Sequence, residues 1–155
     1  FRKNYKGESV LLIYGSGSKE EILKQQVVDL GISEHVHFKG FVEQEELVAA
    51  FQSLDIFIAL SRRESFGVAI LEAQACGVPV LVTDVGGLPE VTSPETGTIV
   101  DDTNPKAWAD KLIETVDKIN NHSMSSLSRE FVLKNFSNEV CVDKIIQVYK
   151  DAQGI

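Results

Sequence analysis

The sequence predicts an α/β fold in which a Rossmann-like, doubly wound parallel sheet is flanked by helices. Two observations support this prediction. Short apolar runs of strand length alternate along the chain with segments of helical periodicity. Strands separated by crossover helices pair in parallel within one sheet. The chain has 155 residues, of which 43% are hydrophobic, and this is enough for one globular domain with a sizeable core.

Five segments have the composition of strands. The first, SVLLIYG, is a continuous apolar run, as expected for a strand that is buried on both faces. The others are HVHFKG, DIFIAL, VPVLVT and the brief TIV. The predicted strands therefore cover residues 9–15, 35–40, 55–60, 78–83 and 98–100.

Six helices are predicted between and after these strands. The first has a capping box at Ser18 and Glu21 and stops at Gly31. The fourth begins with Asn104 and Pro105, a residue pair typical of a helix start. The remaining predicted helices cover residues 43–54, 66–75, 125–134 and 138–152, and the fourth runs to about residue 120.

Charge and composition exclude several classes of protein. The formal net charge of -8 argues against nucleic acid as the main partner and against a polybasic membrane anchor. The sequence has no apolar run long enough to span a bilayer and no signal-peptide pattern. Cys76 and Cys141 lack metal-ligand spacing, which favours reduced thiols in a cytoplasmic protein and predicts no metal site. Because the sequence lacks an initial Met and soon enters a strand, we expect it to be cut from a longer chain.

The loops after the first four predicted strands hold most of the unusual residues, and parallel sheets bind ligands at this edge. Gly15 and Gly17 follow the first strand and lead to a helix N-terminus, where free N–H groups favour an anion. Gly40 follows the second strand, and Gly86 and Gly87 follow the fourth. A Gly-x-Gly before a helix is as often a tight turn, and for Gly40 taken alone a turn is the better explanation. Gly86 and Gly87 allow their loop backbone angles that other residues resist.

The third loop leads into the segment ESFGVAILE, which contains Glu64 and Glu72. With Phe66 as the first helical residue, Glu72 lies roughly 9 Å further along the helix axis. The apolar residues around Glu72 predict a helix that is buried nearly all round, where a carboxylate is costly without a partner. That partner is either a ligand or a structural salt bridge with Arg62, Arg63 or a lysine. For Glu64 the alternative to a ligand contact is a helix cap.

The longer segment ESFGVAILEAQACGVPVLVTDVGGLPEV resembles the donor-binding core of retaining glycosyltransferases of family 4. Their signature is two glutamates separated by seven residues, with Phe-Gly after the first and Gly-x-Pro-Val before the next strand. The resemblance covers almost the whole chain, and Ser65 stands where such proteins often have Gly. It implies half of a GT-B fold. Residues 1–155 would form an amino-terminally truncated donor-binding domain, with the acceptor-binding domain absent.

The resemblance also implies a role for each residue of the site. Glu64 would contact hydroxyls of the donor sugar, and Glu72 would accept hydrogen bonds from the ribose hydroxyls of a nucleotide sugar. Backbone groups of residues 66–68 would lie near the diphosphate, and those of residues 40–42 would hold the base. The residues implied to bind the donor, besides Glu72, are Ser65, Phe66, Gly67, Val68, Gly15, Gly17, Gly40, Phe41, Val42, Gly86 and Gly87.

The activity implied by the resemblance is hexose transfer with retention of configuration. The donor would be a nucleotide-diphosphate sugar, and the acceptor a glycan or lipid-linked sugar in polysaccharide or glycoconjugate synthesis. Such enzymes generally need no metal or cofactor. The full-length enzyme would be cytoplasmic, with peripheral membrane association compatible with its substrates, and the fragment alone would be inactive. The sequence leaves open whether the base is that of UDP, GDP or ADP.

Two other classes of protein are alternatives, one with the same fold and one with a different α/β fold. A catalytically silent nucleotide-binding or interaction module would retain the glycines but would not need both Glu64 and Glu72, so the presence of both argues against it. A response-regulator receiver would need clustered aspartates after the first strand, and the sequence has GSGS there instead.

Overall fold

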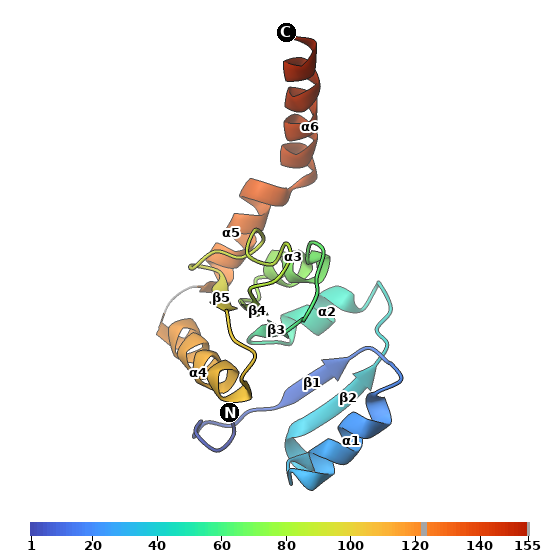
Figure 1. Cartoon of the computed structure of the whole chain (residues 1–155), viewed down its shortest axis with the longest axis vertical. Helices are drawn as coiled ribbons and strands as arrows, with labels where there is room; N and C mark the ends of the chain where they lie inside the picture. Colours follow the sequence, from blue (N-terminus) through green and yellow to red (C-terminus); the bar gives the residue numbers. More distant parts are fainter. Residues whose placement is uncertain (122–123, 155) are drawn as a thin grey trace. The chain divides into compact units, whose positions relative to one another are not determined.

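Figure 1 shows the computed structural model of the chain, which describes residues 1–121 and 124–154. The chain folds into two compact units, Phe1–Ala50 and Phe51–Ile155, and the boundary falls within helix α2 (Leu47–Gln52). Each unit has its own parallel sheet. The predicted parallel α/β architecture is therefore confirmed, with the five strands divided between two sheets.

The first unit is built on a two-stranded sheet. It contains β1 (Leu11–Tyr14), α1 (Glu20–Asp29), the 3-10 helix η1 (Ser33–His35) and β2 (Val36–Gly40). The strands run parallel, with Leu11 opposite Val36 and Ile13 opposite Phe38. Just beyond β1, the N–H group of Gly15 donates to the carbonyl of Gly40 at the end of β2, at 2.7 Å. The loops that follow β1 and β2 therefore begin side by side.

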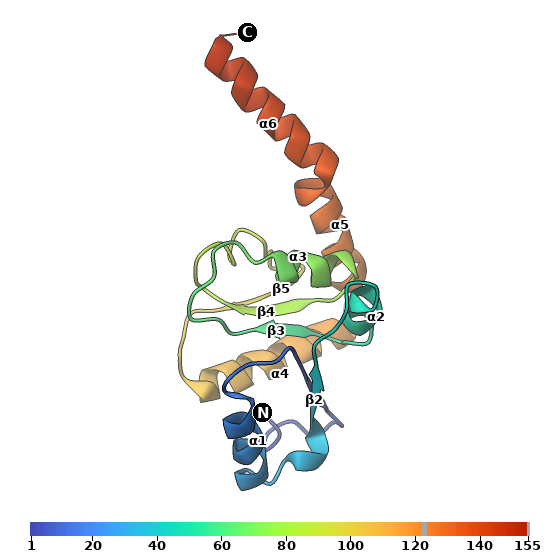
Figure 2. The ribbon, with the colours of Figure 1, turned by 90° about the vertical axis from the view of Figure 1, so that its right-hand side faces the viewer.

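The second unit is built on a three-stranded sheet. It contains β3 (Phe57–Ala59), α3 (Val68–Ala75), β4 (Val80–Thr83), β5 (Gly97–Val100), α4 (Pro105–Asn121), α5 (Met124–Phe136) and α6 (Asn138–Gln153). The strands lie in the order β3-β4-β5, so β4 is central, and all its residues are buried. Figure 2 shows α3 on one face of this sheet and α4 on the other, which is the doubly wound arrangement.

The core of the second unit lies around β4 and α3. Its buried apolar residues include Ile70, Ala73, Val80, Leu81, Val82, Leu88 and Val91. On the other face of the sheet, the buried hydroxyl of Thr115 in α4 donates to the hydroxyl of Thr98 in β5 at 2.8 Å. Helix α5 packs against α3, and the Arg129 guanidinium donates to the carbonyl of Ala75 at the end of α3, at 2.8 Å.

Two expectations about burial, for the first strand and for the helix around Glu72, are wrong. Strand β1 is not buried on both faces, since Leu11 is 46% exposed, because a two-stranded sheet with one helix offers little cover. The helix around Glu72 is not buried nearly all round, since it exposes Val68 and Ala69 while it buries Ile70. Helices α1 and α6 carry apolar stripes, yet neither contains a fully buried residue.

Two predicted helix starts are also wrong. The helix expected from residue 66 begins at Val68, because Gly67 has a φ of 98°, which is outside the helical range. The capping box expected at Ser18 and Glu21 does not form, and α1 has no side-chain cap. Glu21 instead pairs with Lys24 one turn later, at 3.0 Å. The backbone angle of Gly67 and the ion pair of Glu21 with Lys24 are therefore what the local sequence patterns did not predict.

The two longest helices match their predictions closely. Helix α4 begins at Pro105, and the side-chain oxygen of Asn104 accepts a hydrogen bond from the N–H group of Lys106 at 2.9 Å. Helix α6 begins after Ser137, whose hydroxyl accepts from the N–H group of Val140 at 3.3 Å. The second helix is shorter than predicted, since α2 covers Leu47–Gln52, whereas the sequence predicts residues 43–54.

No helix in the described part of the chain has the length and apolar character needed to cross a bilayer. Within the same residues, no group of three or more His, Cys, Asp or Glu side chains is placed to hold a metal ion. Cys76 and Cys141 are free thiols.

Substitution of Ile70 tests the position of the core. Ile70 is 2% exposed, so Ile70→Ala should lower the free energy of unfolding by about 2 to 5 kcal/mol through lost burial and a cavity. The matched control is Ile145→Ala in α6, where the side chain is 56% exposed and the change should stay within about 0.5 kcal/mol. Urea unfolding of both variants measures the difference. Equal losses would contradict this description of the core.

Candidate functional site

The ends of strands β3 and β4 are joined in the second unit. The hydroxyl of Thr83, the last residue of β4, donates to the carbonyl of Ser61, just after β3, at 2.6 Å. Two loops leave these strand ends, and they contain residues 61–67 and 84–91. Because the bond holds the two strand ends together, the loops begin close to each other.

The two loops then meet backbone to backbone. Gly86 has a φ of 55°, and a Cβ atom added there would overlap the carbonyl oxygen of Glu64. A Cβ atom on Gly87 would lie 2.8 Å from the Cα atom of Phe66 and 2.9 Å from the carbonyl oxygen of Ser65. Both distances are too short for a real side chain, so only glycine permits this approach. The predicted special backbone angle of this loop is confirmed at Gly86.

The same contact fixes the start of α3. Gly67 precedes the helix in a left-handed conformation and packs against Leu88, whose Cδ2 would lie 2.7 Å from an added Cβ atom. The carbonyl of Gly67 accepts the first helical hydrogen bond, from Ile70 at 3.0 Å. The N–H groups of Val68 and Ala69 have no acceptor among residues 1–121 and 124–154. They lie at the positive end of the helix dipole, where an anion is favoured.

Glu64 lies just before this helix start. It is half-buried, and its Oε1 atom accepts a hydrogen bond from the N–H group of the adjacent Ser65 at 2.9 Å. The structure shows no side-chain cap at the first turn of α3, so Glu64 does not act as a helix cap. It forms no ion pair with any described residue. Its carboxylate therefore keeps acceptor capacity.

Glu72 lies in the second turn of α3, roughly 6 Å along the axis from Val68. The distance from the helix start to Glu72 is shorter than expected, because α3 begins at Val68 and not at Phe66. Glu72 is half-buried, and within the described residues it forms no ion pair with Arg62, Arg63 or a lysine. The salt-bridge alternative is therefore not realised in this structure.

Cys76 lies one helical turn after Glu72 and is partly buried. Burial raises the pKa of its thiol, while the Arg129 guanidinium acts in the opposite direction and the Glu72 carboxylate adds to the increase. Cys76 is therefore a neutral thiol at neutral pH, which makes it a poor nucleophile.

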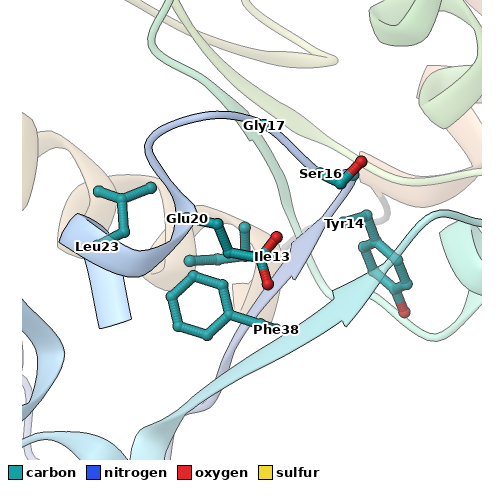
Figure 3. A pocket seen from close by; sticks show the side chains of 8 residues that line it. Ile13, Tyr14, Ser16, Gly17, Glu20, Leu23 and Phe38 are labelled. Carbon is teal, nitrogen blue, oxygen red and sulfur yellow. The ribbon is translucent and has the colours of Figure 1, made fainter. Parts of the chain in front are cut away.

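The glycine loops of the first unit lie beside a hollow of about 150 Å³. Figure 3 shows the loop from Tyr14 to Gly17 arching above it, with Glu20, Leu23 and Phe38 alongside. The residues that line the hollow are Ile13, Tyr14, Gly15, Ser16, Gly17, Glu20, Leu23 and Phe38. Around the Cβ positions of Gly15, Gly17 and Gly40, no described residue other than the adjacent ones has an atom within 4 Å. A ligand could therefore approach the backbone of these loops closely.

The helix that follows this loop already carries two carboxylates at its positive end. Glu20 and Glu21 occupy the first turn of α1, and both pair with Lys24, at 2.9 and 3.0 Å. These carboxylates weaken the attraction of this helix end for a further anion. The start of α3 has no acidic residue in its first turn and is the better anion site of the two.

The site residues predicted from the sequence fall into one group in each unit. In the second unit, direct contacts or helix α3 connect Glu64, Ser65, Phe66, Gly67, Val68, Glu72, Gly86 and Gly87. In the first unit, the paired ends of β1 and β2 connect Gly15, Gly17, Gly40, Phe41 and Val42, with Phe41 74% exposed.

The sequence analysis did not find the contribution of Gln74, which is fully buried in α3 and bonded to the carbonyl of Val91. The available signal was a glutamine inside the apolar segment LEAQACG. A polar side chain among apolar neighbours on a helix is either exposed or hydrogen-bonded inside the core.

Substitution of Gly86 tests the backbone contact. Gly86→Ala should lower the free energy of unfolding by roughly 3 kcal/mol or more, because left-handed strain adds to overlap with Glu64. Gly77→Ala is the matched control in the same unit, with a φ of 81° and its nearest atom at 3.4 Å, an ordinary contact. Its cost should be about 1 to 2 kcal/mol, from strain alone. Urea unfolding compares them, and equal costs would rule out the close approach.

Comparison with known proteins identifies the family. The family described as Glycosyl transferases group 1 matches residues 1–130. D-inositol 3-phosphate glycosyltransferase of Corynebacterium efficiens is 34% identical over 139 residues, which are 89% of this chain and 33% of that protein. GDP-mannose-dependent monoacylated alpha-(1-6)-phosphatidylinositol monomannoside mannosyltransferase of Corynebacterium glutamicum is 32% identical over 149 residues, which are 91% of this chain and 39% of that protein.

Among solved structures, the chain is similar to Anabaena HepE in complex with UDP. The TM-score is 0.79 at 20% identity, over 92% of this chain and 41% of that one, and this likeness concerns the fold. The chain thus spans about two fifths or less of the length of each of these three proteins. The family match covers most of the chain, and the chain therefore belongs to the group 1 glycosyltransferases.

Proposed function

We propose that this chain binds a nucleotide-diphosphate sugar as the donor-binding part of a retaining glycosyltransferase of family 4. The observation that carries the proposal is the pair of Glu64, in the loop just before α3, and Glu72, in the second turn of α3. Both are half-buried, and neither has an ion-pair partner among the described residues. Ionised carboxylates of this kind accept hydrogen bonds from hydroxyls, which sugars and ribose offer in pairs.

In this proposal the donor lies along the start of α3. Glu72 accepts hydrogen bonds from the two ribose hydroxyls, and Glu64 accepts from hydroxyls of the sugar that is transferred. The diphosphate lies against the backbone of residues 66–68, where the helix dipole and the unpaired N–H groups of the first turn favour negative charge. Gly86 and Gly87 hold the backbone of this loop in place through their contact with residues 64–66.

The loops of the first unit supply the remaining donor contacts. Residues 40–42 hold the base mainly through backbone groups, and Gly15 and Gly17 allow close approach of the ligand. The open space around these glycines supports this assignment. The Corynebacterium glutamicum relative is named as GDP-mannose-dependent, whereas the HepE structure contains UDP, so titration with UDP, GDP and ADP identifies the base.

The proposed reaction is a front-face displacement. An acceptor hydroxyl attacks the anomeric carbon on the side from which the diphosphate departs, so the configuration is retained. The bond from that carbon to the diphosphate oxygen breaks, and a diphosphate oxygen takes the proton of the acceptor hydroxyl. Glu64 orients the sugar and stabilises positive charge that develops on it, without forming a covalent bond. The proposed reaction needs no metal.

The acceptor is proposed to be a glycan or a lipid-linked sugar, in polysaccharide or glycoconjugate synthesis in the cytoplasm. Peripheral membrane association of the longer enzyme is compatible with such acceptors. The Corynebacterium glutamicum relative is named for a phosphatidylinositol mannoside, which supports a lipid-linked class. A silent nucleotide-binding module remains the alternative, and it would bind nucleotide without needing both glutamates.

The 155-residue chain alone should bind nucleotide but transfer no sugar, because it spans only 33% and 39% of the two curated relatives and would lack the acceptor half of the site. The assay incubates the chain with UDP-, GDP- and ADP-glucose or GDP-mannose and a panel of glycan and lipid-linked acceptors, with products detected by mass spectrometry. NMR titration with the nucleotides serves as the binding control. A glycosylated product would show that the chain holds a complete site.

Glu72→Gln tests the ribose contact. The substitution removes the charge and replaces one acceptor oxygen with a donor, so it should cost about 2 to 4 kcal/mol of nucleotide affinity. A nucleotide that lacks both ribose hydroxyls should lose about as much with the wild type. The two losses should not add, because both remove the same interaction. NMR titrations of both proteins with both nucleotides, which follow binding into the millimolar range, measure the four affinities.

Glu130→Gln in α5 is the matched control, since Glu130 is an exposed carboxylate of the same unit outside this site. It should leave all affinities unchanged. If the losses from Glu72→Gln and from the missing hydroxyls add, Glu72 does not hold the ribose. If Glu72→Gln lowers the melting temperature alone, its role is structural.

A further inference from the structure

Gln74 is a buried polar residue that the proposed function does not use. Its side chain is 0% exposed in α3. The Nε2 atom donates to the carbonyl of Val91 at 2.7 Å and to the carbonyl of Ile70 at 3.3 Å. The Oε1 atom is buried and has no partner among the described residues. A buried acceptor without a partner lowers stability, so the bonds that the Nε2 atom donates must offset this cost.

The chemistry of the two partners explains why the residue is glutamine. Both are carbonyl oxygens, so only a donor group can face them. A glutamate would place a charged acceptor against two acceptors, and methionine or leucine would leave the Val91 carbonyl without its bond. The amide orientation is set by these partners, because a rotated amide would bring three oxygens together.

Val91 is the end of a turn that carries the two glycines of the site. The N–H group of Val91 donates to the carbonyl of Gly87 at 3.3 Å, and Leu88 donates to Val85 at 3.2 Å. Leu88 and Val91 are both buried. Within the described residues, Gln74 is the side chain that donates to the backbone of residues 85–91. The bond from Gln74 therefore fixes the turn to the last turn of α3.

This turn fixes the position of the backbone around Glu64. Gly86 abuts the carbonyl of Glu64, and Gly87 abuts Ser65 and Phe66. Because these contacts leave no space, a shift of the turn must move residues 64–66 or open a gap beside them. The position of the Glu64 carboxylate thus depends on the anchoring of Val91.

We propose that Gln74 is a positioning residue of the donor site, which holds the turn of residues 85–91 on α3 so that Gly86 and Gly87 fix the backbone of Glu64. The inference rests on the proposed function for its consequence, namely that loss of the Gln74 bond weakens donor binding. Gln74 acts through Val91 and does not touch the donor.

The test is Gln74→Met, which keeps the length and approximate volume of the side chain and removes its donor. Nucleotide affinity should fall by roughly tenfold, a factor typical of one hydrogen bond. In the protein without ligand, the backbone amide resonances of Gly86, Gly87, Glu64 and Ser65 should shift. The UDP, GDP and ADP titrations are followed by NMR.

Thr115→Val is the matched control. Thr115 is equally buried in the same unit, and its hydroxyl donates to Thr98 in β5, away from this turn. This variant should lower the melting temperature while affinity and the four amide resonances stay as in the wild type. If both variants weaken binding equally, or if Gln74→Met leaves those resonances in place, Gln74 is a structural residue only and the proposal is overturned.

A second measurement needs no substitution and covers the case in which Gln74→Met does not fold. In the wild type, the side-chain amide resonances of Gln74 should shift during the titration along the same saturation curve as the amides of Gly86 and Gly87. Unchanged Gln74 resonances beside shifting glycine resonances would refute the coupling. If no nucleotide binds the wild type, the proposed function fails. The spectra of the ligand-free variants then decide the positioning claim alone.

Discussion

The backbone contact between Gly86–Gly87 and residues 64–66 is the constraint on which the site of the second unit depends. It leaves no space for a Cβ atom on either glycine. The bond from Thr83 to Ser61 holds the strand ends from which both loops leave. The same two segments of the chain are thus joined three times in succession. Strands β3 and β4 pair, Thr83 then bonds to Ser61, and the two glycines then contact residues 64–66. Together they bring a carboxylate to the start of a helix that has unpaired N–H groups.

In the described part of the chain, Glu64 and Glu72 are left without ion-pair partners because the lysines that form ion pairs do so elsewhere. The ion pairs found among the described residues join Lys24, Lys106, Lys111 and Lys118 to acids on their own helices. Glu64 and Glu72 have none of these partners. Because both are only half-buried, water solvates them in the absence of a ligand, and their charge costs less than full burial would require. A ligand that bound these carboxylates, as proposed, would replace water there, and no salt bridge among the described residues would have to break first.

Sequence patterns predicted most elements whose signals are local, although the local capping box of α1 does not form, and they failed where distant contacts decide. Asn104 starts α4 as expected, and α6 begins at residue 138 as predicted, because the caps Asn104 and Ser137 lie next to the helices that they begin. The order of strands and helices follows from the apolar pattern alone. The start of α3 was misplaced because Gly67 adopts its angle against Leu88, a residue of another loop. The two acids stand out in the sequence through their spacing, whereas the bond of Gln74 does not, since its partner Val91 is 17 residues away.

Helix α3 carries both Gln74, which holds the neighbouring loop, and Glu72, the proposed ligand-binding carboxylate. Residues two positions apart on a helix point about 200° apart, so Glu72 and Gln74 lie on nearly opposite sides of it. Gln74 is fully buried and holds the turn that carries Gly86 and Gly87, whereas Glu72 is half-exposed and keeps a free carboxylate. An eight-residue helix can serve both purposes only if its inward side is fixed. The bond from the Gln74 amide to the Val91 carbonyl fixes this inward side, since it ties the helix to the loop that contacts the backbone of Glu64.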